Sequence, residues 1–228
     1  MLCAFLAGSF SVGIALFDLD NTLIAGDSDY LWGCFLVEQE IVDGAEYEQA
    51  NQRFYDQYKV GELDIHEFLA FQLRPLAAHP IGQLQAWRAQ YIEEKIRPIL
   101  LPRATELIER HRRQGDTLVI ITATNRFITE PIAALYGIEH LLATEPERRD
   151  GRYTGGVSGT PCFQDGKVRV LEAWLGTHGE TLDDSWFYSD SHNDLPLLGQ
   201  VRQPTAVDPD EILQAHADRH GWPVISLR

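Results

Sequence analysis

The chain has 228 residues and a formal net charge of −15, from 34 acidic and 19 basic side chains. Such a surface repels the phosphates of nucleic acids, and no basic amphipathic stretch suits a membrane surface, so neither is expected as a partner. With 44% hydrophobic residues, the chain is long enough to form one well-buried core and a smaller second unit.

The beginning of the chain is apolar but has none of the positive charges that open a signal peptide. We expect residues 1–10 to form an extra strand or a loosely held leader. The three cysteines are scattered without metal-ligand spacing, a pattern typical of a reducing compartment. The sequence therefore predicts a cytoplasmic protein.

The first clear element is an apolar run that begins at Val12 and ends in two aspartates, Asp18 and Asp20, with Asn21 and Thr22 after them. A continuous apolar run of this length is typical of a strand buried on both faces of a parallel sheet. Open α/β sheets bind their ligands at the carboxyl ends of such strands. Two carboxylates there require a cation, a proton or a catalytic role, unless the strand simply ends in a solvated, Asp-rich turn.

The next segment, as far as residue 96, shows helical periodicity and no convincing strand. Apolar residues recur at the spacing of amphipathic helices, and Asp27, Asp64 and Pro80 stand at expected helix starts. Helices are predicted over residues 27–37, 44–58, 64–74 and 80–92. Short amphipathic helices of this kind fit a small four-helix bundle.

From Pro98 to the end of the chain, strand patterns alternate with helix patterns. Strands are predicted at residues 117–122, 185–190 and 205–207, with short strands or a hairpin at 141–159. Helices are predicted at residues 102–113, 125–136 and 167–175, and from residues 194 and 209 onward. This alternation predicts an α/β fold with a doubly wound, mostly parallel sheet.

Further polar residues follow the later strands in a fixed order. One strand ends in Thr122, Lys167 stands at a helix start, another strand ends in Asp190, and Asp194 comes four residues later. Together with the Asp18 motif, this series resembles the motifs of the haloacid dehalogenase (HAD) superfamily. The residues of the first and last motifs are most similar to those of the branch that contains phosphoserine phosphatase. The resemblance implies a HAD-like core from residues 1–25 and 98–228, and an inserted, all-helical cap from residues 26–97.

The resemblance also implies a chemistry, the hydrolysis of a phosphate monoester through an aspartyl-phosphate intermediate. Asp18 would be the nucleophile, and Asp20 the acid that protonates the leaving alkoxide and then deprotonates water. Mg²⁺ would be bound by the side chains of Asp18 and Asp190 and by the backbone carbonyl of Asp20. Asp194 would not bind the metal itself but would hold a metal-bound water or orient Lys167.

Three residues are expected to hold the phosphoryl group. Thr122 offers a hydroxyl, Lys167 offers a positive charge, and Asn21 follows the nucleophile, where backbone N–H groups can cradle phosphate. Thr124 competes with Thr122, since both hydroxyls follow the same strand. The family motif places the hydroxyl directly after the strand, which favours Thr122.

The same resemblance bears on the substrate. Phosphoserine phosphatases hold the substrate ammonium with an acidic residue shortly after the first motif, a position that Asp27 occupies here. Their cap arginine, which binds the substrate carboxylate, falls near Ala70, and Arg74 is the nearest arginine. The chain therefore suits an amine-bearing phosphate without a carboxylate, such as histidinol phosphate. The alternatives are a phosphoserine phosphatase or a non-catalytic binding protein with this fold, in either case as a monomer or homodimer.

Overall fold

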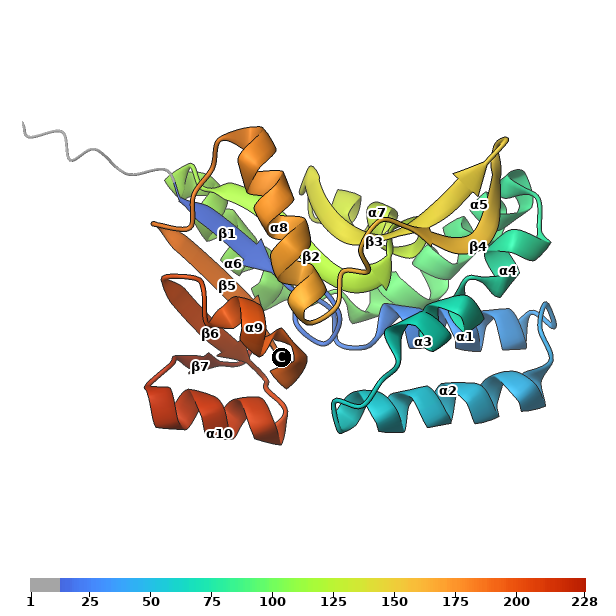
Figure 1. Ribbon diagram of the computed structural model, residues 1–228, viewed down its shortest axis with the longest axis horizontal. Helices are drawn as coiled ribbons and strands as arrows, with labels where there is room; N and C mark the ends of the chain where they lie inside the picture. Colours follow the sequence, from blue (N-terminus) through green and yellow to red (C-terminus); the bar gives the residue numbers. More distant parts are fainter. Residues whose placement is uncertain (1–12) are drawn as a thin grey trace, which may run out of the picture.

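The computed structural model describes residues 13–228, and the expected leader at residues 1–10 lies outside them. Its centre is one sheet of seven strands in the order β4-β3-β2-β1-β5-β6-β7 (Figure 1). Neighbouring strands are parallel except for β3 and β4. The strands are β1 (Ile14–Phe17), β2 (Thr117–Asn125), β3 (His140–Arg149), β4 (Arg152–Ser158), β5 (Ser185–Ser189), β6 (Gln203–Val207) and β7 (Val224–Ile225). The predicted α/β fold with a mostly parallel sheet is confirmed.

The helices of the second half of the chain cover both faces of this sheet. Alternate residues of β1 explain why: Ala15 and Phe17 belong to one buried cluster, and Ile14 and Leu16 to another. The first cluster includes buried residues of α6 (Pro102–Gln114) and α7 (Arg126–Leu135). The second includes residues of α8 (Asp165–His178), α9 (Leu195–Leu198) and α10 (Glu211–His220). A strand buried on both faces accounts for the continuous apolar run in the sequence.

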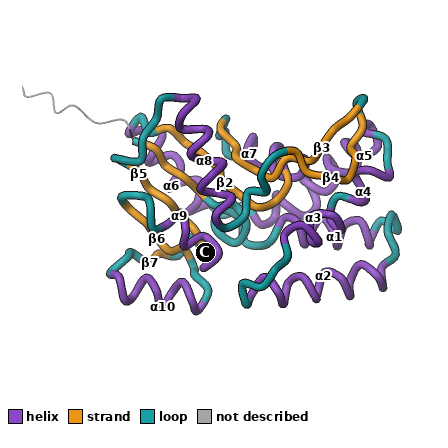
Figure 2. Tube along the Cα trace, in the orientation of Figure 1, coloured by secondary structure: helices purple, strands orange, loops and turns teal. Residues whose placement is uncertain are grey.

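The segment between β1 and α6 is helical, as Figure 2 shows in purple. It forms α1 (Ser28–Glu38), α2 (Gly44–Lys59), α3 (Ile65–Gln72), α4 (Arg74–Ala78) and α5 (Ile81–Tyr91), followed by a π-turn at Ile92–Ile96 and a 3₁₀ turn at Arg97–Ile99. Its buried aromatic residues, such as Trp32 and Tyr91, share the first cluster with Phe17. The bounds of the core and the cap remain predictions.

Three details of the fold differ from the sequence prediction. A further helix, α4, starts at Arg74, because Pro75 is tolerated in the first turn of a helix and does not end the helical segment there. Strand β2 runs on to Asn125, through an irregularity in its pairing with β3 after Ile121. The short strand β7 pairs with the last residues of β6 and has too few residues to leave a periodic pattern.

The β3–β4 hairpin reaches away from the sheet toward the helical segment (Figure 1). Strand β4 contacts α3 and α4. A positive φ of 86° at Gly155 brings its backbone close to α4, where an added Cβ would lie 3.4 Å from the side chain of Ala77. The hairpin was expected from the Asp150-Gly151 turn, but its contact with the helices was not.

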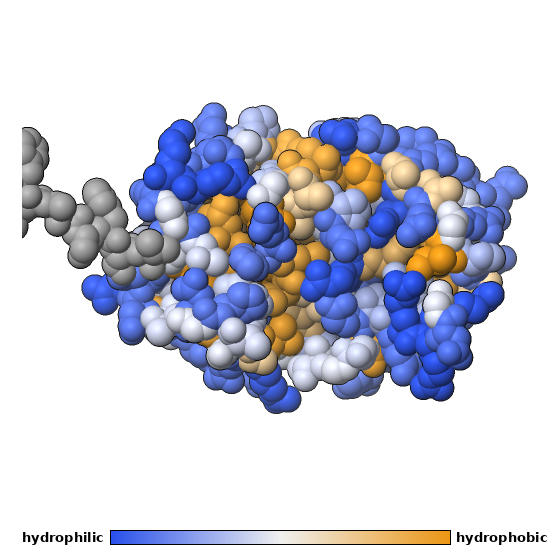
Figure 3. Space-filling model, turned by 90° about the horizontal axis from the view of Figure 1, so that it is seen from above, coloured by the Kyte–Doolittle hydropathy of each residue, from blue (hydrophilic) through white to orange (hydrophobic). Residues whose placement is uncertain are grey.

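The surface and the helices bear on how the protein meets its surroundings. Hydrophilic residues cover most of the face seen in Figure 3, and hydrophobic residues gather near its middle. Among residues 13–228, no helix combines the length and the apolar character needed to cross a bilayer.

A first prediction concerns Gly166, which precedes Lys167 in α8. An added Cβ there would lie 2.0 Å from the carbonyl oxygen of Pro161, a backbone atom that cannot move aside cheaply. We expect Gly166→Ala to lower the free energy of unfolding by about 1–3 kcal/mol, and to lower activity by displacing Lys167. Urea unfolding is the measurement. Gly176→Ala on the same helix meets no atom within 4 Å and should be neutral or stabilising; equal losses in the two variants would contradict the prediction.

Candidate active site

The predicted residues meet at the carboxyl end of β1, in the middle of the sheet. Strand β1 lies between β2 and β5, with Phe17 paired to Ile120 on one side and Tyr188 on the other. The chain leaves these neighbours in opposite directions along the sheet, so the loops after β1, β2 and β5 surround a crevice. Asp18 is held at this position by its backbone N–H, which donates to the carbonyl of Tyr188 at 2.9 Å.

Asp18 forms a buried ion pair with Lys167. Nζ of Lys167 lies 2.7 Å from Oδ1 of Asp18 and 2.7 Å from Oδ1 of Asp194. Asp194 is itself fixed by the Ser189 hydroxyl, which donates to its Oδ2 at 2.6 Å. Burial raises the pKa of Asp18 to about 7, although Lys167 opposes the shift. Burial alone would lower the pKa of Lys167, but the two carboxylates raise it above its ordinary value, so the lysine stays charged.

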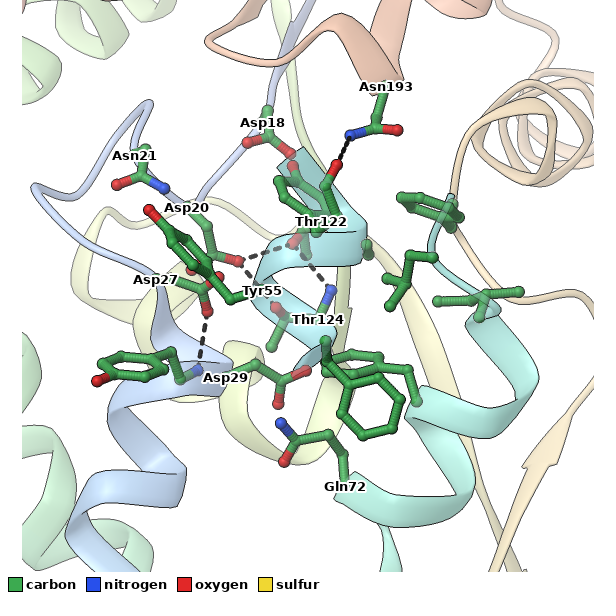
Figure 4. A pocket seen from close by; sticks show the side chains of 18 of the residues that line it. Asp18, Asp20, Asn21, Asp27, Asp29, Tyr55, Gln72, Thr122, Thr124 and Asn193 are labelled. Carbon is green, nitrogen blue, oxygen red and sulfur yellow. Dashed lines mark hydrogen bonds between the residues drawn. The ribbon is translucent and has the colours of Figure 1, made fainter. Parts of the chain in front are cut away.

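The carboxyl group of Asp20 is turned toward β2 and the start of α1. Its Oδ1 accepts the backbone N–H of Ser28 at 2.6 Å. Its Oδ2 accepts the hydroxyl of Thr124 at 2.8 Å and that of Thr122 at 3.4 Å (Figure 4). Burial, and after it the charge of Asp27, raises the pKa of Asp20 to about 6. A carboxyl group whose pKa is raised toward neutral pH binds a proton more readily, which suits a group that donates one.

Asp190 follows β5 and lies against the loop of the first motif. The Thr22 hydroxyl donates to its Oδ1 at 3.2 Å and accepts its backbone N–H at 3.1 Å. Burial and the charges of Asp18 and Asp194 raise the pKa of Asp190 well above its ordinary value. Asp18, Asp190 and Asp194 therefore form one acidic cluster with Lys167, in which Asp190 is half-buried and the other three residues are buried.

This cluster fits a magnesium ion by its chemistry. The described residues contain no group of three or more His, Cys, Asp or Glu side chains arranged to hold a metal. The expected set needs only two such side chains, Asp18 and Asp190, because its third protein ligand is the carbonyl of Asp20. Mg²⁺ prefers oxygen ligands and keeps several waters. Burial raises the pKa of Asp18 and Asp190, with a further contribution from neighbouring carboxylates, and a divalent cation would stabilise the charged forms of both groups.

A cavity extends from this cluster toward α1, α2 and α3. The loop after β1 lines it with Asn21 and Asp27, and Lys167 is the one Lys or Arg among its lining residues within the described chain. Asp27 also caps α1, since its Oδ1 accepts the backbone N–H of Tyr30 at 2.9 Å. Burial raises the pKa of Asp27. The expected specificity residue is thus placed at the cavity wall.

The backbone cradle expected after the nucleophile is not formed by Asn21 and Thr22. The N–H of Asn21 donates to the carbonyl of Gly26 at 2.9 Å, and the N–H of Thr22 donates to the carbonyl of Leu19 at 3.3 Å. Asn21 has a positive φ of 56°, which asparagine tolerates better than most residues. Its side chain still lines the cavity, so the side chain is the part of Asn21 that can contact a phosphoryl group.

The end of α2 contacts the loop that follows β5. The Tyr58 hydroxyl donates to Oγ of Ser191 at 3.0 Å, and Nδ2 of Asn193 donates to the Tyr58 carbonyl at 3.4 Å. Nε2 of Gln164 donates a hydrogen bond to Oδ1 of the same Asn193 amide at 2.9 Å. Sequence reasoning missed these contacts. Asn193 stands inside the last motif, but nothing in the sequence of α2 pointed to Tyr58.

A second prediction concerns Thr124 and the proton that Asp20 donates. Thr124 makes the shorter bond to Asp20, so we expect Thr124→Val to weaken the proton-donating step, by about 10-fold in kcat/KM for an alkyl phosphate. The loss should be smaller for 4-nitrophenyl phosphate, whose leaving group needs no proton. Steady-state kinetics on both substrates is the measurement, with Thr105→Val on the exposed side of α6 as control. An equal loss on both substrates would contradict this role for Thr124.

Comparison with known proteins places this site in a family. The family model of haloacid dehalogenase-like hydrolases matches residues 15–199, and the chain belongs to that family. A histidinol-phosphatase of Neisseria meningitidis serogroup C (strain 8013) is 43% identical over 219 residues, which cover 94% of this chain and 99% of that protein. Phosphoserine phosphatase SerB1 of Mycobacterium tuberculosis (strain ATCC 25618 / H37Rv) is 29% identical, over 94% of this chain and 70% of that protein.

Solved structures agree with this placement. A protein of unknown function from Bordetella pertussis Tohama I gives a TM-score of 0.90 at 44% identity, covering 96% of this chain and 100% of that chain. A phosphoserine phosphatase with an analogue of the phospho-aspartyl intermediate gives a TM-score of 0.70 at 18% identity, covering 96% and 94%, and shares the fold. The predicted superfamily and branch, and the prediction of a phosphoric monoester hydrolase, are confirmed.

Proposed function

We propose that this protein is a Mg²⁺-dependent phosphatase that hydrolyses a small, amine-bearing phosphate monoester, with histidinol phosphate as its substrate. The observation that carries the proposal is the charge of the cavity. Five aspartates line it: Asp18, Asp20, Asp27, Asp29 and Asp194. Lys167, the one lysine or arginine among its lining residues in the described part of the chain, is already paired with Asp18 and Asp194.

The reaction begins at Asp18. Lys167 binds Oδ1 of this carboxylate, which leaves Oδ2 to attack phosphorus and form an aspartyl-phosphate. Bound Mg²⁺ supplies a positive charge that reduces the repulsion between the carboxylate and the phosphate. Thr122 and the Asn21 side chain line the space where the phosphoryl oxygens lie, and both can donate hydrogen bonds to them.

Asp20 acts first as the general acid and then as the general base. Held by Ser28 and Thr124, its carboxyl group donates a proton to the leaving alkoxide as the ester bond breaks. The resulting carboxylate then removes a proton from the water that attacks the aspartyl-phosphate, which releases inorganic phosphate and restores both aspartates. Asp194 acts as a positioning residue, since it touches Lys167 and Ser189 and holds the ammonium group beside Asp18.

The choice between histidinol phosphate and phosphoserine rests on the missing counterion for a carboxylate. The arginine nearest to the expected position, Arg74, pairs with Glu46 at 2.9 Å, and both side chains are more than half exposed. Helix α3 instead lines the cavity with Ile65, Phe68 and Gln72. A substrate carboxylate would be buried there without a cation, which is costly. The 43% identity to a protein named histidinol-phosphatase supports the same choice.

The test is a kinetic comparison of histidinol phosphate, phosphoserine and 4-nitrophenyl phosphate, each with Mg²⁺ and with the metal removed by EDTA. The proposal predicts that kcat/KM is highest for histidinol phosphate and at least about 10-fold lower for phosphoserine, and that EDTA abolishes all three activities. Faster turnover of phosphoserine would overturn the substrate assignment. Full activity after removal of the metal would overturn the role of Mg²⁺.

A further inference from the structure

Asp29 is a buried carboxylate that the mechanism above does not use. It stands in the first turn of α1, is 3% exposed and lines the cavity. Its Oδ1 accepts a hydrogen bond from Nδ2 of Asn125 at 3.3 Å, and its Oδ2 is buried with no hydrogen-bond partner among residues 13–228. In Figure 4, Asp29 lies beyond Asp27 and Thr124 as seen from Asp18, next to Gln72. A buried carboxylate oxygen that borders a cavity and has no partner calls for a donor from a ligand.

Asp29 is neither the cap of α1 nor a member of any ion pair of the described residues. The cap of α1 is Asp27, whose side chain already accepts the N–H of Tyr30. No described lysine, arginine or histidine forms an ion pair with Asp29, as none of the ion pairs of residues 13–228 includes it. Burial and the charges of Asp27 and Asp20 raise its pKa well above the ordinary value. The burial of the charged form of this carboxyl group is therefore unfavourable in free energy.

The cavity that Asp29 lines also has aromatic and aliphatic walls. Phe54 and Tyr55 of α2 and Ile65 and Phe68 of α3 line it. The rings of Phe54 and Phe68 meet edge to face, with centroids 5.3 Å apart. Aromatic and aliphatic walls beside an unpartnered carboxylate oxygen suit a flat ring that carries an N–H group, because the ring contacts the walls and the N–H meets the carboxylate. An ammonium group alone would leave the apolar walls unfilled.

We propose that Asp29 determines specificity by accepting, on its Oδ2, the N–H of an imidazole ring of the substrate, with Phe54, Tyr55 and Phe68 around that ring. This inference rests on the proposed function. The order of acidic groups away from the nucleophile then matches the order of groups in the substrate: phosphate at Asp18, amine at Asp27 and ring at Asp29.

The test compares two substrates that differ in the ring. Histidinol phosphate carries the phosphate, the amine and the imidazole, whereas 2-aminoethyl phosphate carries only the first two. We expect Asp29→Asn to lower kcat/KM for histidinol phosphate by about 10-fold and Asp29→Ala by about 100-fold, mainly through KM, as for the loss of a hydrogen bond to a charged group. For 2-aminoethyl phosphate, both variants should stay within about twofold of the wild type.

Two further measurements keep the outcomes distinct. Asp43→Asn, the same change at an exposed helix cap of α2, should leave both substrates unaffected. Thermal unfolding should show no loss of stability in Asp29→Asn, because the amide keeps the shape of a side chain whose charged form is unfavourable where it is buried. A lowered melting temperature with equal losses on both substrates would overturn the proposal, since it would show a structural role.

The wild type separates this inference from the function on which it rests. A wild-type enzyme that hydrolyses both substrates equally well would overturn the ring subsite and leave the phosphatase activity in place. An enzyme that hydrolyses no phosphate ester at all would overturn the proposed function itself. Retention of the wild-type preference for histidinol phosphate in both Asp29 variants would overturn the role of Asp29 alone.

Discussion

Replacement of Asp18 by asparagine is expected to abolish phosphate ester hydrolysis, with a fall in kcat of about 10⁴-fold or more. An amide oxygen is a far weaker nucleophile than a carboxylate, and no other group of the described site is placed beside Lys167 with a free oxygen. Turnover of 4-nitrophenyl phosphate with Mg²⁺ is the measurement. Because this ester has a good leaving group, a loss of activity points to the attacking group and not to the proton donor.

The Asp18 variant should remain folded. Burial raises the pKa of Asp18 to about 7, which shows that its charged form is poorly solvated, and the amide removes that charge while keeping the shape. We therefore expect the free energy of unfolding at neutral pH to stay at or above the wild-type value. Asp218→Asn on the exposed side of α10 is the matched control and should keep full activity. Activity that survives in Asp18→Asn would refute the nucleophile assignment.

The second large effect is expected from Lys167→Met, which removes the cation between two buried carboxylates. Lys167 is 3% exposed and lies 2.7 Å from both Asp18 and Asp194. Its loss leaves the two negative charges without a common partner, and we expect a destabilisation of about 3–5 kcal/mol in the absence of metal. The fall in kcat should be about 10²–10³-fold, because a positive charge is lost where charge develops in the reaction.

Urea unfolding of Lys167→Met, with and without Mg²⁺, measures the stability effect. The metal should recover part of the loss, since it neutralises the same cluster. Lys95→Met serves as the control: Lys95 pairs with Glu38 at 2.6 Å, but the glutamate is half exposed, and such surface pairs contribute only about 0–1 kcal/mol. Equal effects of the two substitutions would contradict the account of the buried cluster.

The centre of the site was predictable because strand ends are predictable. Apolar runs that end in Asp18, Thr122 and Asp190 implied parallel strands, and the carboxyl ends of neighbouring parallel strands lie at one edge of a sheet. Lys167 was assigned by the family resemblance, from its place between the second and fourth motifs. The structure shows Lys167 directly at Asp18, as the order of motifs predicted.

The outer part of the site was not predictable, because it depends on packing between helices that are distant in the sequence. An acidic residue in the first turn of a helix, such as Asp29, usually reflects the helix dipole. Its burial is a tertiary property, since Asp29 is 3% exposed and lines a cavity to which α2 and α3 also contribute residues. The role of Tyr58 likewise depends on where α2 ends relative to Ser191, which local sequence does not encode.

The β3–β4 hairpin shows the same limit in the fold. The turn at Asp150-Gly151 predicts two antiparallel strands, and the structure has them. Nothing in the alternation of these strands indicates that β4 contacts α3 and α4. Tertiary contacts between a hairpin and an inserted segment need the orientation of both, and periodicity gives the orientation of neither.

The most direct test of the account is to find where the phosphoryl group goes. Enzyme mixed with substrate and Mg²⁺ is quenched in acid within one turnover, reduced with borohydride, and analysed by peptide mass spectrometry. An aspartyl-phosphate is reduced to homoserine, so the account predicts homoserine at Asp18 and at no other aspartate. Homoserine at a different position, or turnover without modification of any aspartate, would contradict it.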